Sequence, residues 1–148
     1  MFKRIGIVLL AIGLLLSMTG CRYVFPRKGD ITAYTHDIDV SARFTAAEID
    51  NAISVAAAYF EEHYEECVLD KIIYEEDFSN RQVMDSDGNV PPNWMLVELR
   101  FTATKYNQAP YLAPERSSMV YLLLTREGAD ETWYVDHTAT GGIMSPQG

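Results

Sequence analysis

The stretch that decides the fold is Phe44-Thr45-Ala46-Ala47-Glu48-Ile49, which opens a helical pattern in the first half of the chain. Thr45 and Glu48 have the spacing of a capping box, in which each side chain accepts a hydrogen bond from the other residue's amide. Phe44 and Ile49 occupy the two positions of a hydrophobic staple around that cap. An apolar stripe follows at intervals of three or four, at Ile49, Ile53, Ala56, Phe60, Tyr64 and Cys67. The stripe predicts an amphipathic helix of about five turns that ends near Glu66.

Beyond this helix the apolar period changes to two, which is typical of strands. Strands are predicted over residues 68–75, 94–105, 117–127 and 132–138, with the last two joined as a hairpin. In the second of these strands one face is formed by Met95, Val97, Leu99, Phe101 and Ala103. In the third, Val120, Leu122 and Leu124 oppose Met119, Tyr121 and Leu123. Before the helix, the apolar residues Ile31, Ala33, Ile38 and Val40 are compatible with a short or interrupted strand.

The predicted fold class is therefore α+β, with one long N-terminal helix packed on a curved antiparallel sheet of about four strands. The helix has to bury its apolar stripe against one face of that sheet. This order of elements resembles the cystatin-like fold. A chain of 148 residues is expected to form one domain.

The front of the chain has the pattern of an export signal. Lys3 and Arg4 precede an apolar core over residues 5–16, whose 12 residues suit a signal peptide better than a membrane span of about 20. The following Thr19-Gly20-Cys21 resembles the lipobox of bacterial lipoproteins, although Met18 stands where leucine is usual. That resemblance implies a diacylglycerol on Cys21, which becomes the new N-terminus after cleavage.

We therefore expect a lipoprotein signal peptide at residues 1–20, the lipidated cysteine and a tether at 21–30, and a single α+β domain at 31–148. The protein is placed on the extracytoplasmic face of the bacterial cell membrane, held there by the lipid on Cys21. An uncleaved anchor is the alternative, since the uncharged run over residues 5–21 has 17 residues. Basic residues before the run stay cytoplasmic, so both interpretations place the rest of the chain outside the cytoplasm.

Charge excludes one class of partner. The whole chain has a net charge of −9, and residues 45–90 alone carry twelve acidic and two basic side chains. Nucleic-acid binding needs a basic footprint, so no nucleic-acid partner is expected. The expected partners are the membrane, through the lipid, and an unidentified protein or small molecule.

No motif predicts a catalytic, cofactor or metal site. Glu61, Glu62, Glu65 and Glu66 diverge around the helix, and His63 has no second histidine one turn away. Residues 85–89 resemble part of a calcium loop, but Val83 and Trp94 stand at the first and last ligand positions. Asp136 and His137 are neighbours in a predicted strand and should point to opposite faces. After lipidation of Cys21 only Cys67 is a free thiol, and it is interpreted as a small buried hydrophobic residue.

The chain also resembles a family of small uncharacterised lipoproteins from Gram-positive bacteria. The residues that carry this resemblance are Phe44-Thr45-Ala46-Ala47-Glu48-Ile49, Phe60, Cys67-Val68-Leu69, Ile72-Ile73-Tyr74-Glu75 and Trp133-Tyr134-Val135-Asp136. These motifs are structural, and the resemblance implies a location and a fold without an activity.

Two functional hypotheses remain open. The first is a non-catalytic binding or interaction module anchored by lipid, because an anchor and a small domain occur without a convergent polar motif. The second is a small-ligand carrier or an enzyme that uses a pocket between the helix and the curved sheet. In that case His63, Tyr59, Tyr64 and Tyr74 are the candidate lining residues.

Overall fold

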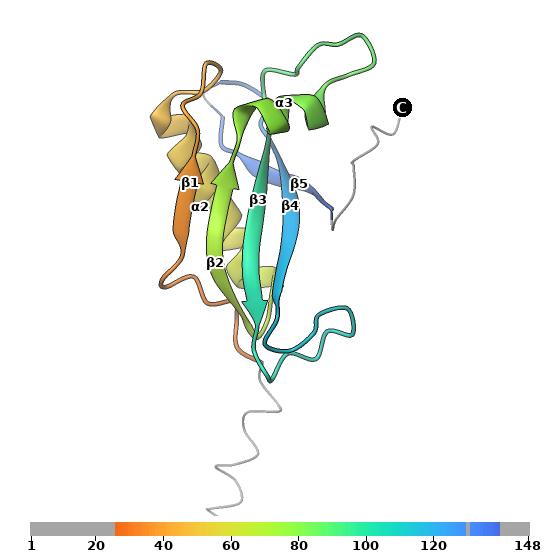
Figure 1. Cartoon of the computed structure of the whole chain (residues 1–148). Helices are drawn as coiled ribbons and strands as arrows, with labels where there is room; N and C mark the ends of the chain where they lie inside the picture. The colour runs from red at the N-terminus through yellow and green to blue at the C-terminus, as the bar shows by residue number, and fades with distance from the viewer. Residues whose placement is uncertain (1–25, 130, 140–148) are drawn as a thin grey trace, which may run out of the picture.

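The computed structural model describes residues 26–129 and 131–139, and Figure 1 shows their arrangement. The predicted signal peptide and Cys21 lie outside the described residues. The elements in chain order are β1 (Thr35–Ile38), α2 (Ala46–His63), β2 (Cys67–Tyr74), α3 (Glu76–Val83), β3 (Trp94–Ala103), β4 (Ser117–Thr125) and β5 (Tyr134–Ala139). The α+β class is confirmed.

The five strands form one open, mixed sheet in the order β1-β2-β3-β4-β5. Strand β1 pairs with β2 in parallel, and every later pair is antiparallel. The expected one helix and about four strands were therefore too few, because α3 and β1 add to them. Strand β1 uses the middle of the short segment that the sequence indicated, whereas Val40 lies beyond it and is exposed.

Helix α2 begins at the predicted cap. The Thr45 amide donates to Glu48 Oε2 at 2.7 Å, and the Glu48 amide donates to Thr45 Oγ1 at 3.3 Å, so both halves of the capping box are present. The apolar stripe faces the sheet, as predicted. Its buried residues are Ile49, Ala52, Ile53, Ala56, Ala57 and Phe60.

The helix ends at His63, three residues before the predicted end near Glu66. Glu66 has a φ of +54°, which is the left-handed conformation that glycine usually adopts after the end of a helix. Here a glutamate adopts it. Its buried carboxylate accepts hydrogen bonds from the Arg27 amide at 3.1 Å and from Thr104 Oγ1 at 3.2 Å. These tertiary bonds hold the chain in the turn that leads into β2.

The main core lies between α2 and one face of the sheet (Figure 1). The predicted inward residues of β3 are all buried there, and so are Val120, Leu122 and Leu124 of β4. Helix α3 covers one end of the opposite face, where Val83 packs with Leu96 and Leu123. The alternation within β3 and β4 was therefore predicted correctly, and the second face carries its own small core.

β1 and the residues that lead into it form an N-terminal strap, residues 27–38, which is attached to the fold. The Gly29 amide donates to Glu61 O at 2.9 Å, and the Asp30 amide donates to Cys67 O at 2.8 Å. Strand β1 continues the pairing along β2. A Cβ on Gly29 would lie 2.7 Å from Phe60 O, so only glycine fits this close approach. Residues 27–30, assigned to the tether from sequence, thus contact the domain directly.

An ion pair joins the start of α2 to the β4–β5 hairpin. Arg126 Nη2 lies 2.5 Å from Glu48 Oε1, and its guanidinium stacks over the Trp133 ring at 4.4 Å. The Trp133 indole N–H donates to Glu48 O at 3.1 Å, and Arg126 Nη1 donates to Ala129 O at 2.8 Å. Arg126 is 7% exposed, and its Nε has no hydrogen-bond partner within the described part of the chain. The cap of α2 and the turn after β4 therefore depend on each other.

This arrangement predicts acid sensitivity. The amide and hydroxyl of Thr45, and then Arg126, lower the pKa of Glu48 from its usual 4.5 to about 2. A carboxyl group with a lowered pKa in the folded state adds stability above its unfolded pKa and loses it as the pH falls. The stabilisation by Glu48 should be complete above pH 4.5 and decline towards pH 2. Denaturant titrations of the wild type and Glu48→Gln across this range should therefore differ most at neutral pH and converge in acid.

Candidate functional site

A concave site lies at the end of the domain where α2 ends and β2 begins. We call this end the lower pole and define it as residues 26–29, 63–67 and 104–116, which lie together at the bottom of Figure 1. The Thr104 amide donates to Glu66 O at 2.8 Å, and Asn107 Nδ2 donates to Glu65 O at 2.7 Å. The loop between β3 and β4 is thereby fixed beside the end of α2.

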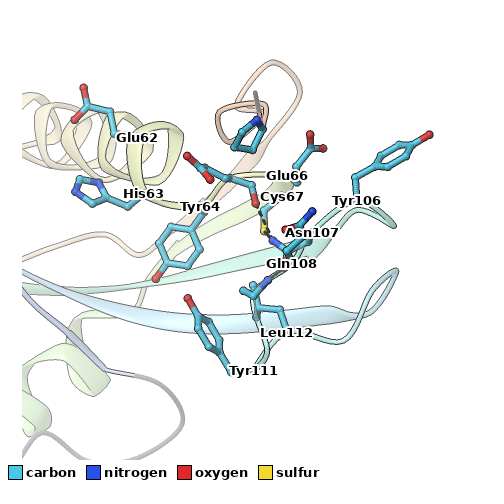
Figure 2. A pocket seen from close by; sticks show the side chains of 13 residues that line it. Glu62, His63, Tyr64, Glu66, Cys67, Tyr106, Asn107, Gln108, Tyr111 and Leu112 are labelled. Carbon is cyan, nitrogen blue, oxygen red and sulfur yellow. Dashed lines mark hydrogen bonds between the residues drawn. The ribbon is translucent and has the colours of Figure 1, made fainter. Parts of the chain in front are cut away.

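A pocket of about 340 Å³ opens at this pole. Figure 2 shows its walls, with the end of α2 and the start of β2 on one side and the β3–β4 loop on the other. Its lining residues are Pro26, the run from Glu62 to Cys67, the run from Tyr106 to Ala109, Tyr111 and Leu112. No sequence pattern indicates this pocket, since its two walls are about forty residues apart and converge only through tertiary hydrogen bonds.

Three titratable side chains of the pocket, those of His63, Glu66 and Cys67, are engaged in structural bonds. His63 Nδ1 lies 2.9 Å from Tyr59 O, one turn back along the helix, and the two rings stack. The Glu66 carboxylate is bound by the Arg27 amide and the Thr104 hydroxyl. Cys67 Sγ accepts from Asn107 Nδ2 at 3.3 Å. This pattern holds the pole together, and it offers no pair of groups arranged as acid and base.

Burial makes Cys67 a poor nucleophile. It raises the pKa of the thiol to about 11, against which the Asn107 hydrogen bond acts only in part. Because the thiolate is the reactive form, the folded protein should react slowly with iodoacetamide at neutral pH. A chain carrying Cys21→Ala has Cys67 as its one thiol and allows the rate to be measured by mass spectrometry. The same chain in denaturant should react quickly, and equal rates in both conditions would contradict the burial of Cys67.

Of the four residues proposed from sequence to line a helix–sheet pocket, three lie together at the end of α2, and Tyr74 lies apart from them. His63 and Tyr64 line the pocket at the lower pole. Tyr59 stacks on His63 and packs at the margin of the core. Tyr74 is fully buried at the other end of β2, roughly 23 Å from Cys67 along the strand, where its ring meets Phe44. Burial raises the pKa values of Tyr64 and Tyr74 to about 12, so both phenols are neutral.

The acidic side chains of the described residues do not gather into a cation site. Among the described residues, no group of three or more histidine, cysteine, aspartate or glutamate side chains could hold a metal ion. The Asp85 carboxylate closes its own turn, because it accepts from the Asn89 amide at 2.8 Å and from the Asp87 amide at 3.0 Å. These hydrogen bonds lower the pKa of Asp85, and the bond from the Asn89 amide has the largest effect.

Asp136 and His137 do form a pair, contrary to the expectation from strand alternation. His137 Nδ1 lies 2.8 Å from Asp136 Oδ2. Leu123 pairs with His137 and Leu124 with Val135, so Asp136 is an extra residue at a β-bulge. The bulge breaks the alternation and lets neighbouring side chains meet. Both side chains are exposed on β5, and no described pocket contains them.

The sheet face opposite α2 is partly exposed to solvent where α3 does not cover it. We call it the open face and define it by Glu98, Arg100, Thr102, Met119 and Tyr121. Arg100 Nε lies 2.5 Å from Glu98 Oε1, and Thr102 Oγ1 donates to Asp70 Oδ2 at 2.8 Å. Met119, opposite Arg100 across the β3–β4 pair, is 43% exposed. Helix α3 covers only the end of this face next to Tyr121, whose ring lies 5.4 Å from that of Phe78.

Within the described residues, neither helix has both the length and the apolar character needed to cross a membrane. Comparisons of this chain with protein-family models, with curated proteins and with solved structures find no match.

Proposed function

We propose that this protein is a lipid-anchored extracytoplasmic lipoprotein that acts as a non-catalytic binding module for a protein partner. The observation that carries the proposal is the open face, a partly exposed sheet surface on a domain whose helix–sheet interior is filled by buried side chains. Arginine, methionine and tyrosine are enriched at protein interfaces, and the open face presents all three at Arg100, Met119 and Tyr121. The structural bonds of His63, Glu66 and Cys67 argue against catalysis at the lower pole.

The anchoring half of the proposal rests on the lipobox-like Thr19-Gly20-Cys21. We also propose that the domain is a variant of the cystatin-like fold, related to small lipoproteins of Gram-positive bacteria. A helix followed by the antiparallel meander β2-β3-β4-β5 supports that likeness. The parallel strand β1 and the short helix α3 are then additions to this plan.

A small-ligand carrier is the second candidate, and the pocket at the lower pole is the observation that favours it. Its volume of about 340 Å³ lies at the small end of ligand pockets. Native mass spectrometry of protein released gently from membranes tests for a bound compound. A mass increment that disappears in Leu112→Trp, which would fill the pocket, would place this function ahead of protein binding.

Lipidation is tested by labelling cells with a fatty-acid probe. The wild-type chain should incorporate the probe, and Cys21→Ala should not. Equal labelling of both chains would show that Cys21 is not the lipidation site.

The binding face is tested by photo-crosslinking on whole cells. A photoreactive amino acid in place of Met119 should give a discrete crosslinked species that mass spectrometry identifies as a protein. The matched control places the same amino acid at Asp50, which is exposed on the solvent side of α2. Adding Arg100→Ala should weaken the Met119 crosslink. A crosslink from Asp50 of equal strength, or none from Met119, would count against the open face.

A further inference from the structure

The described chain begins at the lower pole, close to the residue proposed to carry lipid. Pro26 lines the pocket there, and Arg27 is fixed by hydrogen bonds in both directions with Glu66. Pro26 follows Cys21 by only five positions, a reach of at most about 18 Å. Helix α2, with 18 residues, spans about 27 Å along the domain. An anchor on Cys21 thus holds the lower pole near the membrane and keeps the opposite pole away from it.

The β3–β4 loop gives this pole a surface suited to a membrane interface. Residues 106–114 read Tyr-Asn-Gln-Ala-Pro-Tyr-Leu-Ala-Pro and contain no charged side chain. Tyr111 is 76% exposed, which makes it the most exposed large aromatic side chain among the described residues. Tyrosine is enriched at the headgroup level of membranes, because its ring is apolar and its hydroxyl remains hydrated. The uncharged run and the exposed tyrosine therefore share one location beside Pro26.

Charge around the loop is balanced. The basic side chains of the lower pole are Arg27, Lys28, Lys105 and Arg116, and the acidic ones are Glu65, Glu66 and Glu115, to which Glu62, directly before the pole on α2 and lining its pocket, adds a fourth. Four charges of each sign give little net attraction to, or repulsion from, an anionic surface. Contact with lipid would therefore depend on the aromatic loop and on the short tether.

We infer that the β3–β4 loop lies in the headgroup layer of the membrane, with Tyr111 inserted, and sets the orientation of the domain. This inference rests on the proposed lipid anchor at Cys21. With the lower pole on the membrane, the strands extend away from the lipid surface, and the open face is roughly perpendicular to the membrane plane. The pocket then opens towards the headgroups, and the open face is accessible to a protein partner.

The test uses the lipidated full-length protein in phosphatidylcholine liposomes, with and without phosphatidylglycerol. A nitroxide label is placed at Ala113→Cys, beside an intact Tyr111, or at Ser86→Cys in the exposed loop of the opposite pole. Collision rates with a water-soluble nickel complex and with oxygen report how deep each label lies. We expect the label at residue 113 to be several-fold less accessible to nickel than the label at residue 86, in both lipid mixtures.

Matched variants separate the loop from the tether. Tyr111→Asp should restore nickel access at residue 113, whereas Tyr134→Asp, at an exposed tyrosine of β5, should leave it unchanged. Both variants should keep the circular dichroism spectrum of the parent chain. A label at 113 as accessible as that at 86 on lipidated protein would contradict the inference while leaving the anchor intact. Mass spectrometry that finds no diacylglycerol on Cys21 would instead contradict the proposed anchor. Protection at 113 on cells but not in liposomes would show that a protein covers the loop, and would also contradict it.

Discussion

Replacing Phe60 with alanine should lower the free energy of unfolding by about 3–5 kcal/mol, the usual cost of truncating a buried phenylalanine. Phe60 is fully buried, stacks on Tyr64 at 4.9 Å and lies 5.4 Å from the Phe101 ring. Its ring also packs closely against the strap at Gly29, where a Cβ added to the glycine would lie only 2.9 Å from the ring. Truncation therefore opens a cavity between α2, the sheet and the strap at once.

The control is Glu62→Ala, two residues further along the same helix. Glu62 is exposed, so its removal should change stability by less than about 0.5 kcal/mol. Urea denaturation of residues 22–148, which keep the strap, measures both variants. Similar costs for the two would mean that α2 is rotated relative to its described position.

Replacing Arg126 with alanine should cost about 3 kcal/mol, the lower end of the range for removing one partner of a buried ion pair. The lower end is expected because Glu48 keeps its bonds to Thr45 and has a side chain that is 25% exposed. The change also removes the stack on Trp133 and the bond to Ala129 O. Thermal and urea denaturation provide the measurement.

The matched control is Arg100→Ala. Arg100 and Glu98 have the same 2.5 Å contact as Arg126 and Glu48, but the Arg100 side chain is 53% exposed. An exposed ion pair contributes about 0–1 kcal/mol, so this variant should unfold almost like the wild type. If Arg100→Ala were as destabilising as Arg126→Ala, burial would not be what distinguishes the two pairs. Arg126→Met adds a further comparison, since it keeps apolar contact with Trp133 and removes the charge.

Features that depend on local periodicity were predictable from sequence. The cap at Thr45 and the apolar stripe of α2 arise from neighbours along one helix, and the alternation in β3 arises from neighbours along one strand. Helix α3 was missed because it is short and polar, and because its N-cap, Glu75, makes no side-chain capping bond. The hydroxyl of its buried Ser79 accepts a hydrogen bond from the Leu96 amide at 2.9 Å, which joins α3 to β3.

Features that join distant segments were not predictable. Arg126 and Glu48 are 78 residues apart, and nothing in either neighbourhood indicates the pair. The end of α2 was placed too late because Glu66 is held in its turn by Arg27 and Thr104, which are distant in sequence. The walls of the pocket converge for the same reason. The Asp136–His137 pair depends on a bulge that alternation cannot reveal.

The strap has a mechanical consequence for a protein tethered at its N-terminus. If Cys21 is held in lipid while a partner pulls on the open face, tension enters the domain at Pro26 and runs along the strap. The strap is parallel to β2 and is bonded to it from Asp30 onwards, through the bridge to Val68 and then through β1. Because hydrogen bonds between strands lie across the strand direction, tension along the strap shears many of them together. A strap attached in the opposite direction would be peeled away one bond at a time. The direction of entry thus favours a domain that stays folded when it is pulled from its anchor.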